Sequence, residues 1–193
     1  MKINRLKNDI SLLPPKAKRV FQGEIFDIYQ WDQLMFDGTT ALFEKIVRAD
    51  TVTIIPIIEN KILIQYQEQP YHHTFISLPG GRVDQNEDVL TASKRELIEE
   101  TGYKANEWIS LMKTQPFNKM IWKMHYYIAR DCIRTNLQHL DSGEKIENRL
   151  ISFDEFLLLS ENELFRDKEL ARYILQIRLH PEKLETFKKL LFK

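Results

Sequence analysis

Three glutamates in the middle of the chain have the residue types and spacing of a divalent-cation site. They are Glu96, Glu99 and Glu100, in the segment RELIEETGY that spans residues 95–103. In a helix, where successive residues turn by about 100°, these carboxylates share a stripe that covers roughly one-third of the circumference. The alternative is a solvated charged face, on which like charges repel by a few tenths of a kcal/mol per exposed pair. A Gly-rich turn at residues 78–81 precedes the stripe, and its carbonyls add to the oxygen ligands that Mg²⁺ and Mn²⁺ prefer, which favours the cation site.

A longer pattern of fixed spacing surrounds these glutamates. It consists of Gly81, Glu87, Arg95, Glu96, Leu97, Glu99, Glu100, Gly102 and Tyr103. These residues fill every specified position of the Nudix box, so the chain resembles the Nudix hydrolases. The resemblance implies a loop–helix–loop metal site inside an α/β/α sandwich. It also implies metal-dependent hydrolysis of a nucleoside diphosphate linked to another moiety.

The resemblance assigns a role to each functional residue of the box. The implied ligands of Mg²⁺ or Mn²⁺ are the carbonyl of Gly80 and the carboxylates of Glu96, Glu99 and Glu100. Arg95 would orient Glu99 through an ion pair between residues i and i+4. Glu87, at the helix start, would brace the loop or hold the ligands from behind.

A second acidic segment, residues 141–147, contains the expected general base. In similar enzymes a loop glutamate at this place binds metal or serves as the base. The resemblance implies Glu144, which follows a hinge at Gly143. Glu147 is the second candidate, and we expect it on the strand that follows. A surface loop without a catalytic role is the alternative interpretation.

A narrower resemblance covers most of the chain. The order of residues 23–26, 37–38, 43–47 and 78–81 is similar to that of the ADP-ribose pyrophosphatase branch. In that branch the N-terminal strands form a small sheet that swaps across a homodimer, and aromatic side chains clamp the nucleobase. The substrate-binding candidates are Phe43, Glu44, Phe26, Trp31, Gln67 and Arg82. For the aromatic residues, packing within the small sheet is the alternative.

The chain also departs from this branch at three places. Ser77 stands where the branch often has Glu, and residues 65–69 (QYQEQ) lack the Arg that is common there. Phe117 follows Pro116 where glycine is usual. These positions concern the identity of the substrate and leave the hydrolytic box complete.

The surrounding pattern predicts an α/β (α+β) fold, a Nudix α/β/α sandwich with a mixed sheet. Residues 1–48 would form a small N-terminal antiparallel β-sheet used for dimerisation, and residues 49–193 the hydrolase domain with its C-terminal helices. Strands are expected at residues 21–34, 39–47, 51–58, 61–66, 108–114, 121–129 and 146–151, with a loop at 131–143. Helices are expected at residues 88–101, 152–159, 167–179 and 182–192, the first ended by Gly102.

Composition narrows the function classes. The 193 residues include 28 Lys and Arg and 28 Asp and Glu, and this balance argues against a nucleic-acid binder that relies on a basic field. The single cysteine, Cys132, makes no intramolecular disulfide. No apolar window is long enough for a membrane span, so we expect a cytoplasmic protein that does not use the membrane.

Together these observations predict a Mg²⁺-dependent hydrolase, active as a homodimer, that cleaves ADP-ribose or a related nucleoside diphosphate sugar. The alternatives are hydrolysis of another nucleoside diphosphate derivative, such as a dinucleoside polyphosphate, an oxidised nucleotide or an RNA cap, and a non-catalytic domain that senses a metabolite. The complete set of box glutamates argues against a pure sensor, which has no need of every metal ligand.

Overall fold

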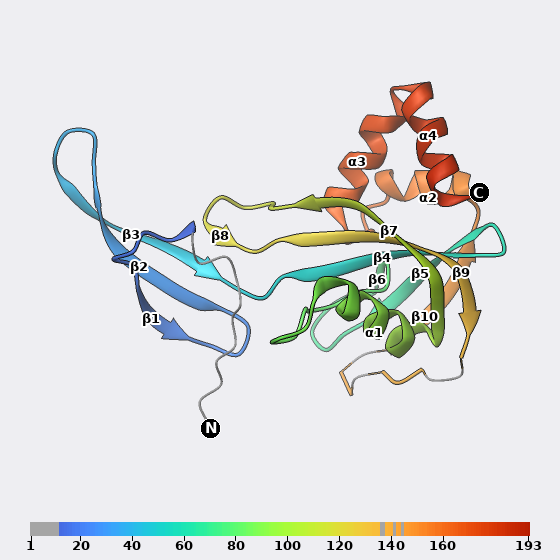
Figure 1. The fold of residues 1–193 in the computed structure, drawn as a ribbon, viewed down its shortest axis with the longest axis horizontal. Helices are drawn as coiled ribbons and strands as arrows, with labels where there is room; N and C mark the ends of the chain where they lie inside the picture. Colours follow the sequence, from blue (N-terminus) through green and yellow to red (C-terminus); the bar gives the residue numbers. More distant parts are fainter. Residues whose placement is uncertain (1–11, 136–137, 141, 144) are drawn as a thin grey trace.

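The computed structural model describes residues 12–135, 138–140, 142–143 and 145–193. These residues form two mixed sheets and four α-helices (Figure 1). The smaller sheet lies at one end of the molecule, and its hairpin extends beyond the rest of the chain (Figure 1). No helix among the described residues is long and apolar enough to cross a membrane.

The N-terminal sheet contains β1 (Lys18–Gln22), β2 (Asp27–Leu34), β3 (Thr40–Val47) and, at its edge, β8 (Met120–Ile121). The first three strands pair antiparallel, as predicted, but β8 runs parallel to β3, so the sheet is mixed. The single strand predicted at residues 21–34 is wrong. A turn divides it, in which the Gly23 amide donates to the Phe26 carbonyl at 2.9 Å.

The main sheet has the order β10-β5-β4-β9-β7, with β6 paired to β5. Its strands are β4 (Thr51–Ile58), β5 (Lys61–Glu68), β6 (Phe75–Ser77), β7 (Tyr103–Thr114), β9 (Met124–Arg134) and β10 (Lys145–Ile151). Only β4 and β9 run parallel among the pairs along this path. The nearly continuous apolar sequence of β4 fits its central place, where both faces are covered.

Helices cover both faces of this sheet, as the sandwich prediction requires. α1 (Val89–Thr101) packs on one face, where the core contains Val52, Ile54, Ala92, Leu97 and Ala129. The other face carries α2 (Phe153–Leu158), a 3-10 turn η2 (Leu159–Glu161), α3 (Lys168–Arg178) and α4 (Pro181–Leu191). Their larger core includes Ile55, Ile64, Tyr126, Phe156, Phe165 and Phe187.

The ends of α1 follow the predicted signals. The Asp88 side chain accepts from the amides of Leu90 and Thr91, both at 3.0 Å, and so caps the N-terminus. Gly102 ends the helix at φ 71°, a left-handed conformation that favours glycine, and its amide donates to the Ile98 carbonyl. These caps fix the length and direction of the helix that carries the box glutamates.

The central strands separate beside the Gly-rich turn. β4 and β5 pair only near their connecting turn, through Ile57 with Ile62 and Ile58 with Lys61. Farther along, the amides of β4 donate instead to the turn: Val52 to the Gly81 carbonyl at 2.9 Å and Ile54 to the Pro79 carbonyl at 2.8 Å. The turn therefore lies against the edge of β4 that β5 has left.

Two sequence predictions at the strand ends are wrong. The sequence predicts a loop over residues 131–143, but β9 continues to Arg134. The strand predicted to begin at residue 108 begins at Tyr103, because β7 pairs with β9 along that whole length. The sequence pattern also gives no indication of β6. This strand is three residues long, too short for an alternating pattern to appear.

Candidate active site

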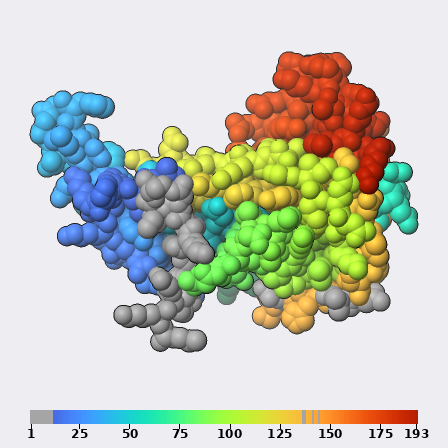
Figure 2. Space-filling model, viewed as in Figure 1, coloured from blue at the N-terminus to red at the C-terminus, as the bar shows by residue number. Residues whose placement is uncertain are grey.

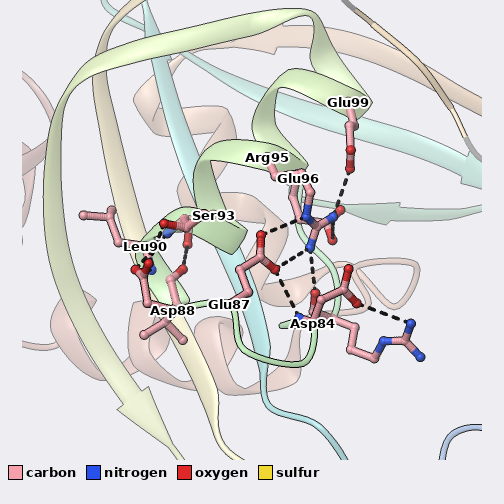
Figure 3. Close-up of polar contacts among 11 residues, drawn as sticks. Asp84, Glu87, Asp88, Leu90, Ser93, Arg95, Glu96 and Glu99 are labelled. Atoms are coloured by element: carbon pink, nitrogen blue, oxygen red, sulfur yellow. Dashed lines mark hydrogen bonds and ion pairs between the residues drawn. The ribbon is translucent and has the colours of Figure 1, made fainter. Parts of the chain in front are cut away.

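Arg95 is the centre of the polar contacts at the start of α1 (Figure 3). Its Nε and Nη2 each donate to one oxygen of the Glu87 carboxylate at 3.0 Å. Its Nη1 donates to Glu96 at 2.8 Å and to Glu99 at 2.9 Å, and Nη2 also donates to the Arg82 carbonyl. The predicted pair of Arg95 with Glu99 is thus present. Because one planar guanidinium binds all these groups, it fixes the loop and the helix relative to each other.

Hydrogen bonds between Arg95 and Glu87 keep both side chains ionised. Hydrogen bonds from Arg95 hold the pKa of Glu87 below its usual range, against an opposing effect of burial. The bond to Glu87, followed by the smaller contributions of Glu96 and Glu99, raises the pKa of Arg95. Glu87 is thus paired with Arg95, and the bracing role that the family resemblance implies for it stays a prediction.

Glu100 lies at the base of the Gly-rich turn. Its side chain is buried and its Oε2 accepts from the Gly80 amide at 2.9 Å. A Cβ at residue 80 would collide with the Val52 carbonyl, and a Cβ at Gly81 would collide with the Glu96 carboxylate. Glycine is therefore required at residue 80 by the close approach of the β4 backbone, whereas a side chain at residue 81 would displace the Glu96 carboxylate.

The donor set fits a hard divalent cation. Three carboxylates, those of Glu87, Glu96 and Glu99, contact the single guanidinium of Arg95, and a fourth, that of Glu100, accepts from the Gly80 amide. This excess of negative charge and oxygen donors suits Mg²⁺ or Mn²⁺. Among the described residues no group of three or more acidic, histidine or cysteine side chains is arranged to hold a metal ion. Glu96 and Glu99 are held by Arg95, whereas Glu100 is held by Gly80.

A cavity of about 380 Å³ opens beside Glu100, Gly80 and Gly81, in the space where β4 and β5 separate. Arg48, Arg82 and Arg166 are among its lining residues. Burial lowers the pKa of Arg48, and the charges of Arg166 and Arg82 lower it further. Guanidinium groups that repel one another around a cavity favour an anionic ligand.

Two of these arginines lie over aromatic rings of the cavity wall. Arg48 lies 4.6 Å from the ring centre of Trp122, and Arg166 lies 4.8 Å from that of Phe75. The Arg166 amide donates to the Ile76 carbonyl at 2.8 Å, which ties the segment before α3 to β6. The sequence does not mark Arg48, Arg166 or Trp122 as functional residues. They lie outside the box, and only the fold brings them together.

The substrate candidates of the sequence analysis separate into two groups. Gln67 and Arg82 line the cavity, whereas Phe43, Glu44, Phe26 and Trp31 do not. Trp31 is buried and its ring lies 6.1 Å from that of Phe43, which agrees with packing within the small sheet. Glu44 accepts from the Gln30 side chain at 3.0 Å.

Only one of the two candidates for the general base lies among the described residues. Glu144 lies outside the described residues. Glu147 is exposed on β10, and its hydrogen bond from Arg149, at 2.8 Å, lowers its pKa. The next residue, Asn148, donates to the Glu100 carbonyl at 3.2 Å. Since neighbouring side chains of a strand face opposite ways, Glu147 points away from α1.

Comparison with known proteins identifies the family of the chain. The family pattern described as the NUDIX domain matches residues 47–173. The chain is 28% identical over 160 residues to a methanol dehydrogenase activator of Bacillus methanolicus, covering 79% of this chain and 85% of that protein. It is 26% identical over 168 residues to an ADP-ribose pyrophosphatase of Bacillus subtilis, covering 84% and 90%.

Two further similarities extend the comparison. A CMP-5'-(N-acetyl-N-hydroxy-3-aminopropyl)phosphonate hydrolase of Streptomyces rubellomurinus is 34% identical over 146 residues, covering 72% of this chain and 69% of that protein. The crystal structure of an ADP compounds hydrolase has the same fold, with a TM-score of 0.71, 22% identity, and coverage of 87% of this chain and 94% of that one. The resemblance seen in the box is confirmed, and the chain belongs to the NUDIX family of hydrolases.

Proposed function

We propose that this hydrolase is a divalent-cation-dependent pyrophosphatase that cleaves ADP-ribose or a related nucleoside diphosphate sugar to a nucleoside monophosphate and a sugar phosphate. One observation carries the proposal: Glu100 of the acidic helix and three arginines line the same cavity. A diphosphate needs both kinds of group, cations for its charge and carboxylates to hold a metal. An ADP-ribose pyrophosphatase among the relatives supports this substrate class.

The reaction consumes one water. Its oxygen bonds to one phosphorus, the bond from that phosphorus to the bridging oxygen breaks, and each product keeps one phosphate group. Mg²⁺, when held by Glu96, Glu99 and Glu100, would neutralise phosphate oxygens and lower the pKa of a bound water. Arg48, Arg82 and Arg166 would bind the remaining phosphate charge at the cavity wall.

The proton of the attacking water requires a base. Glu144, which the family resemblance implies, is the proposed base. Glu147 is a poor alternative because its exposed carboxylate is bonded to Arg149 and lies on the strand face directed away from α1. A base must come within about 2.6–3.2 Å of the water or of one bridging water.

The substrate proposal predicts a ranking in a hydrolysis panel. With Mg²⁺, and again with Mn²⁺, ADP-ribose should be cleaved to AMP and ribose phosphate, detected by product chromatography. EDTA should abolish turnover, because it removes the cation. As a test of the base, Glu144→Gln should reduce kcat far more than Glu147→Gln. Faster cleavage of a dinucleoside polyphosphate, an oxidised nucleotide or an RNA cap would assign a different substrate, and binding without hydrolysis would indicate a sensor.

The small sheet supports a homodimer, the assembly that we propose. Exposed apolar side chains gather on it: Val20, Phe21, Ile25, Phe26, Leu34, Phe36 and Leu42. Figure 2 shows the sheet, in blue, projecting from the main body at the left of the view. A projecting patch of this kind is typical of an interaction surface. A partner subunit would cover these side chains and bring its own aromatic residues towards the cavity.

Light scattering tests the assembly directly. At micromolar concentration the mass should be twice the 23.1 kDa of one chain. Leu42→Glu, on β3, should produce monomers because it buries a charge in the proposed interface. Leu179→Glu, at a more exposed position at the end of α3, should remain dimeric. A monomeric parent protein would refute the homodimer.

A further inference from the structure

A row of buried neutral side chains lies next to Glu100. Asn148 of β10 is paired with Gln65 of β5, and Gln65 is paired with Ser77 of β6, so the three side chains share one face of the sheet. Gln65 is fully buried and Ser77 is 9% exposed. Among the described residues, Gln65 Nε2, Ser77 Oγ and Asn148 Oδ1 have no hydrogen-bond partner. Buried polar atoms of this kind are rare in folded proteins, because leaving them unpaired is costly.

Ser77 brings one end of this row to the cavity wall. Ser77 and Gln67 both line it together with Glu100. The side-chain amide of Gln67 donates to Oε1 of the Gln65 side chain at 2.7 Å, so Gln65 fixes the orientation of the Gln67 amide. Asn148 donates to the backbone carbonyl of Glu100 and thereby holds the row against the C-terminal end of α1.

The chemistry of Ser77 and Gln67 determines which kind of ligand they can bind. Ser77 and Gln67 offer donors and acceptors without a net charge, which suits a hydroxyl group, itself a donor and an acceptor. The positive charge that a phosphate needs comes instead from the arginines of the wall.

A nucleobase is disfavoured at the aromatic rings of the cavity. The cavity's aromatic rings already have stacking partners: Trp122 stacks with Phe117 at 6.2 Å and 16° and also lies under Arg48. Phe75 lies under Arg166. A base that stacked on Trp122 would have to displace Phe117 or Arg48, whereas a sugar needs only hydrogen-bonding groups.

We propose that Ser77 and Gln67, with Gln65 as a positioning residue, form a neutral subsite that binds a hydroxyl group of the sugar attached to the diphosphate. This assignment rests on the proposed function and adds the residues that distinguish a nucleoside diphosphate sugar from a plain nucleoside diphosphate. Both side chains of the subsite lie in segments where the chain departs from the ADP-ribose pyrophosphatase branch, Gln67 in residues 65–69 and Ser77 before the Gly-rich turn.

Binding without turnover tests the subsite. The full chain is titrated calorimetrically with ADP-ribose and with ADP in EDTA, and chromatography checks that ADP-ribose stays intact. The parent protein should bind ADP-ribose more tightly than ADP. Ser77→Ala should weaken ADP-ribose binding by roughly three- to tenfold, the range of one hydrogen bond, and change ADP binding less than about twofold.

Ser93→Ala is the matched control. It removes another buried serine hydroxyl, one that donates to the Val89 carbonyl within α1, and should leave the ratio of the two affinities unchanged. Because Ser77 Oγ makes no hydrogen bond in the described structure, Ser77→Ala should keep the parental Tm. Gln67→Glu, which adds a negative charge beside Glu100, should weaken ADP-ribose binding further.

Two results would overturn the subsite. One is a parent protein that binds ADP-ribose no more tightly than ADP. The other is a folded Ser77→Ala protein with an unchanged affinity ratio. Neither depends on hydrolysis, so failure of ADP-ribose cleavage in the panel with Mg²⁺ would count against the proposed function alone.

Discussion

Glu100→Gln is expected to lower kcat/KM at limiting Mg²⁺ by at least about a hundredfold while the protein stays folded. The substitution keeps the size of the side chain but removes one negative charge from the carboxylates that would hold the cation. A Gln side chain still offers one oxygen to the Gly80 amide, which donates to Glu100 at 2.9 Å. The turn should therefore remain in place, and the loss should be one of charge.

The design of the measurement separates charge from folding. Activity is followed as a function of Mg²⁺ concentration, and Tm is recorded for each variant. The variant should need more Mg²⁺ for half-maximal rate. Glu185→Gln, on α4 and paired only weakly with Lys189 at 3.7 Å, is the control and should match the parent protein. Near-parental turnover of folded Glu100→Gln at limiting Mg²⁺ would remove the acidic helix from the proposed mechanism.

The parts of the fold that local chemistry specifies were predictable. Asp88 and Gly102 mark the ends of α1 through their own side chain and backbone conformation. The turn at Glu59 and Asn60, both at positive φ, separates two strands that were read directly from apolar residues. In each case the signal lies within a few residues of the structure that it determines.

The cavity was not predictable in the same way. Arg48 follows β3 and Arg166 precedes α3, more than a hundred residues apart in sequence, and both reach the cavity because β4 and β5 separate. The separation itself depends on β6 and on backbone bonds from β4 to the Gly-rich turn. No local pattern contains that information, and for the same reason the sequence could not distinguish Gln67, in the wall, from Phe43, which packs on Trp31.

Arg95→Lys should cost both activity and stability although it keeps the positive charge. A lysine ammonium has three donors at one point, and it cannot reproduce a planar fork that binds two oxygens of Glu87 together with Glu96 and Glu99. Loss of a partly buried bond to a charged group costs about 2 kcal/mol. For a chain of this size that corresponds to a fall in Tm of roughly 4–8 °C. Since the box carboxylates lose their fixed positions, kcat should fall by about 10–100-fold.

Arg95→Ala distinguishes bracing from charge balance. It leaves four carboxylates, those of Glu87, Glu96, Glu99 and Glu100, without the guanidinium that three of them contact. Added Mg²⁺ should then raise Tm more in this variant than in the parent protein, because the cation supplies the missing positive charge to the folded state. Arg172→Lys, whose guanidinium makes one exposed pair with Glu169 on α3, should change neither Tm nor kcat. An Arg95→Lys protein with parental Tm and kcat would show that the fork does not hold the site. If Mg²⁺ shifted the Tm of Arg95→Ala and parent equally, Arg95 would have no part in balancing the carboxylate charge.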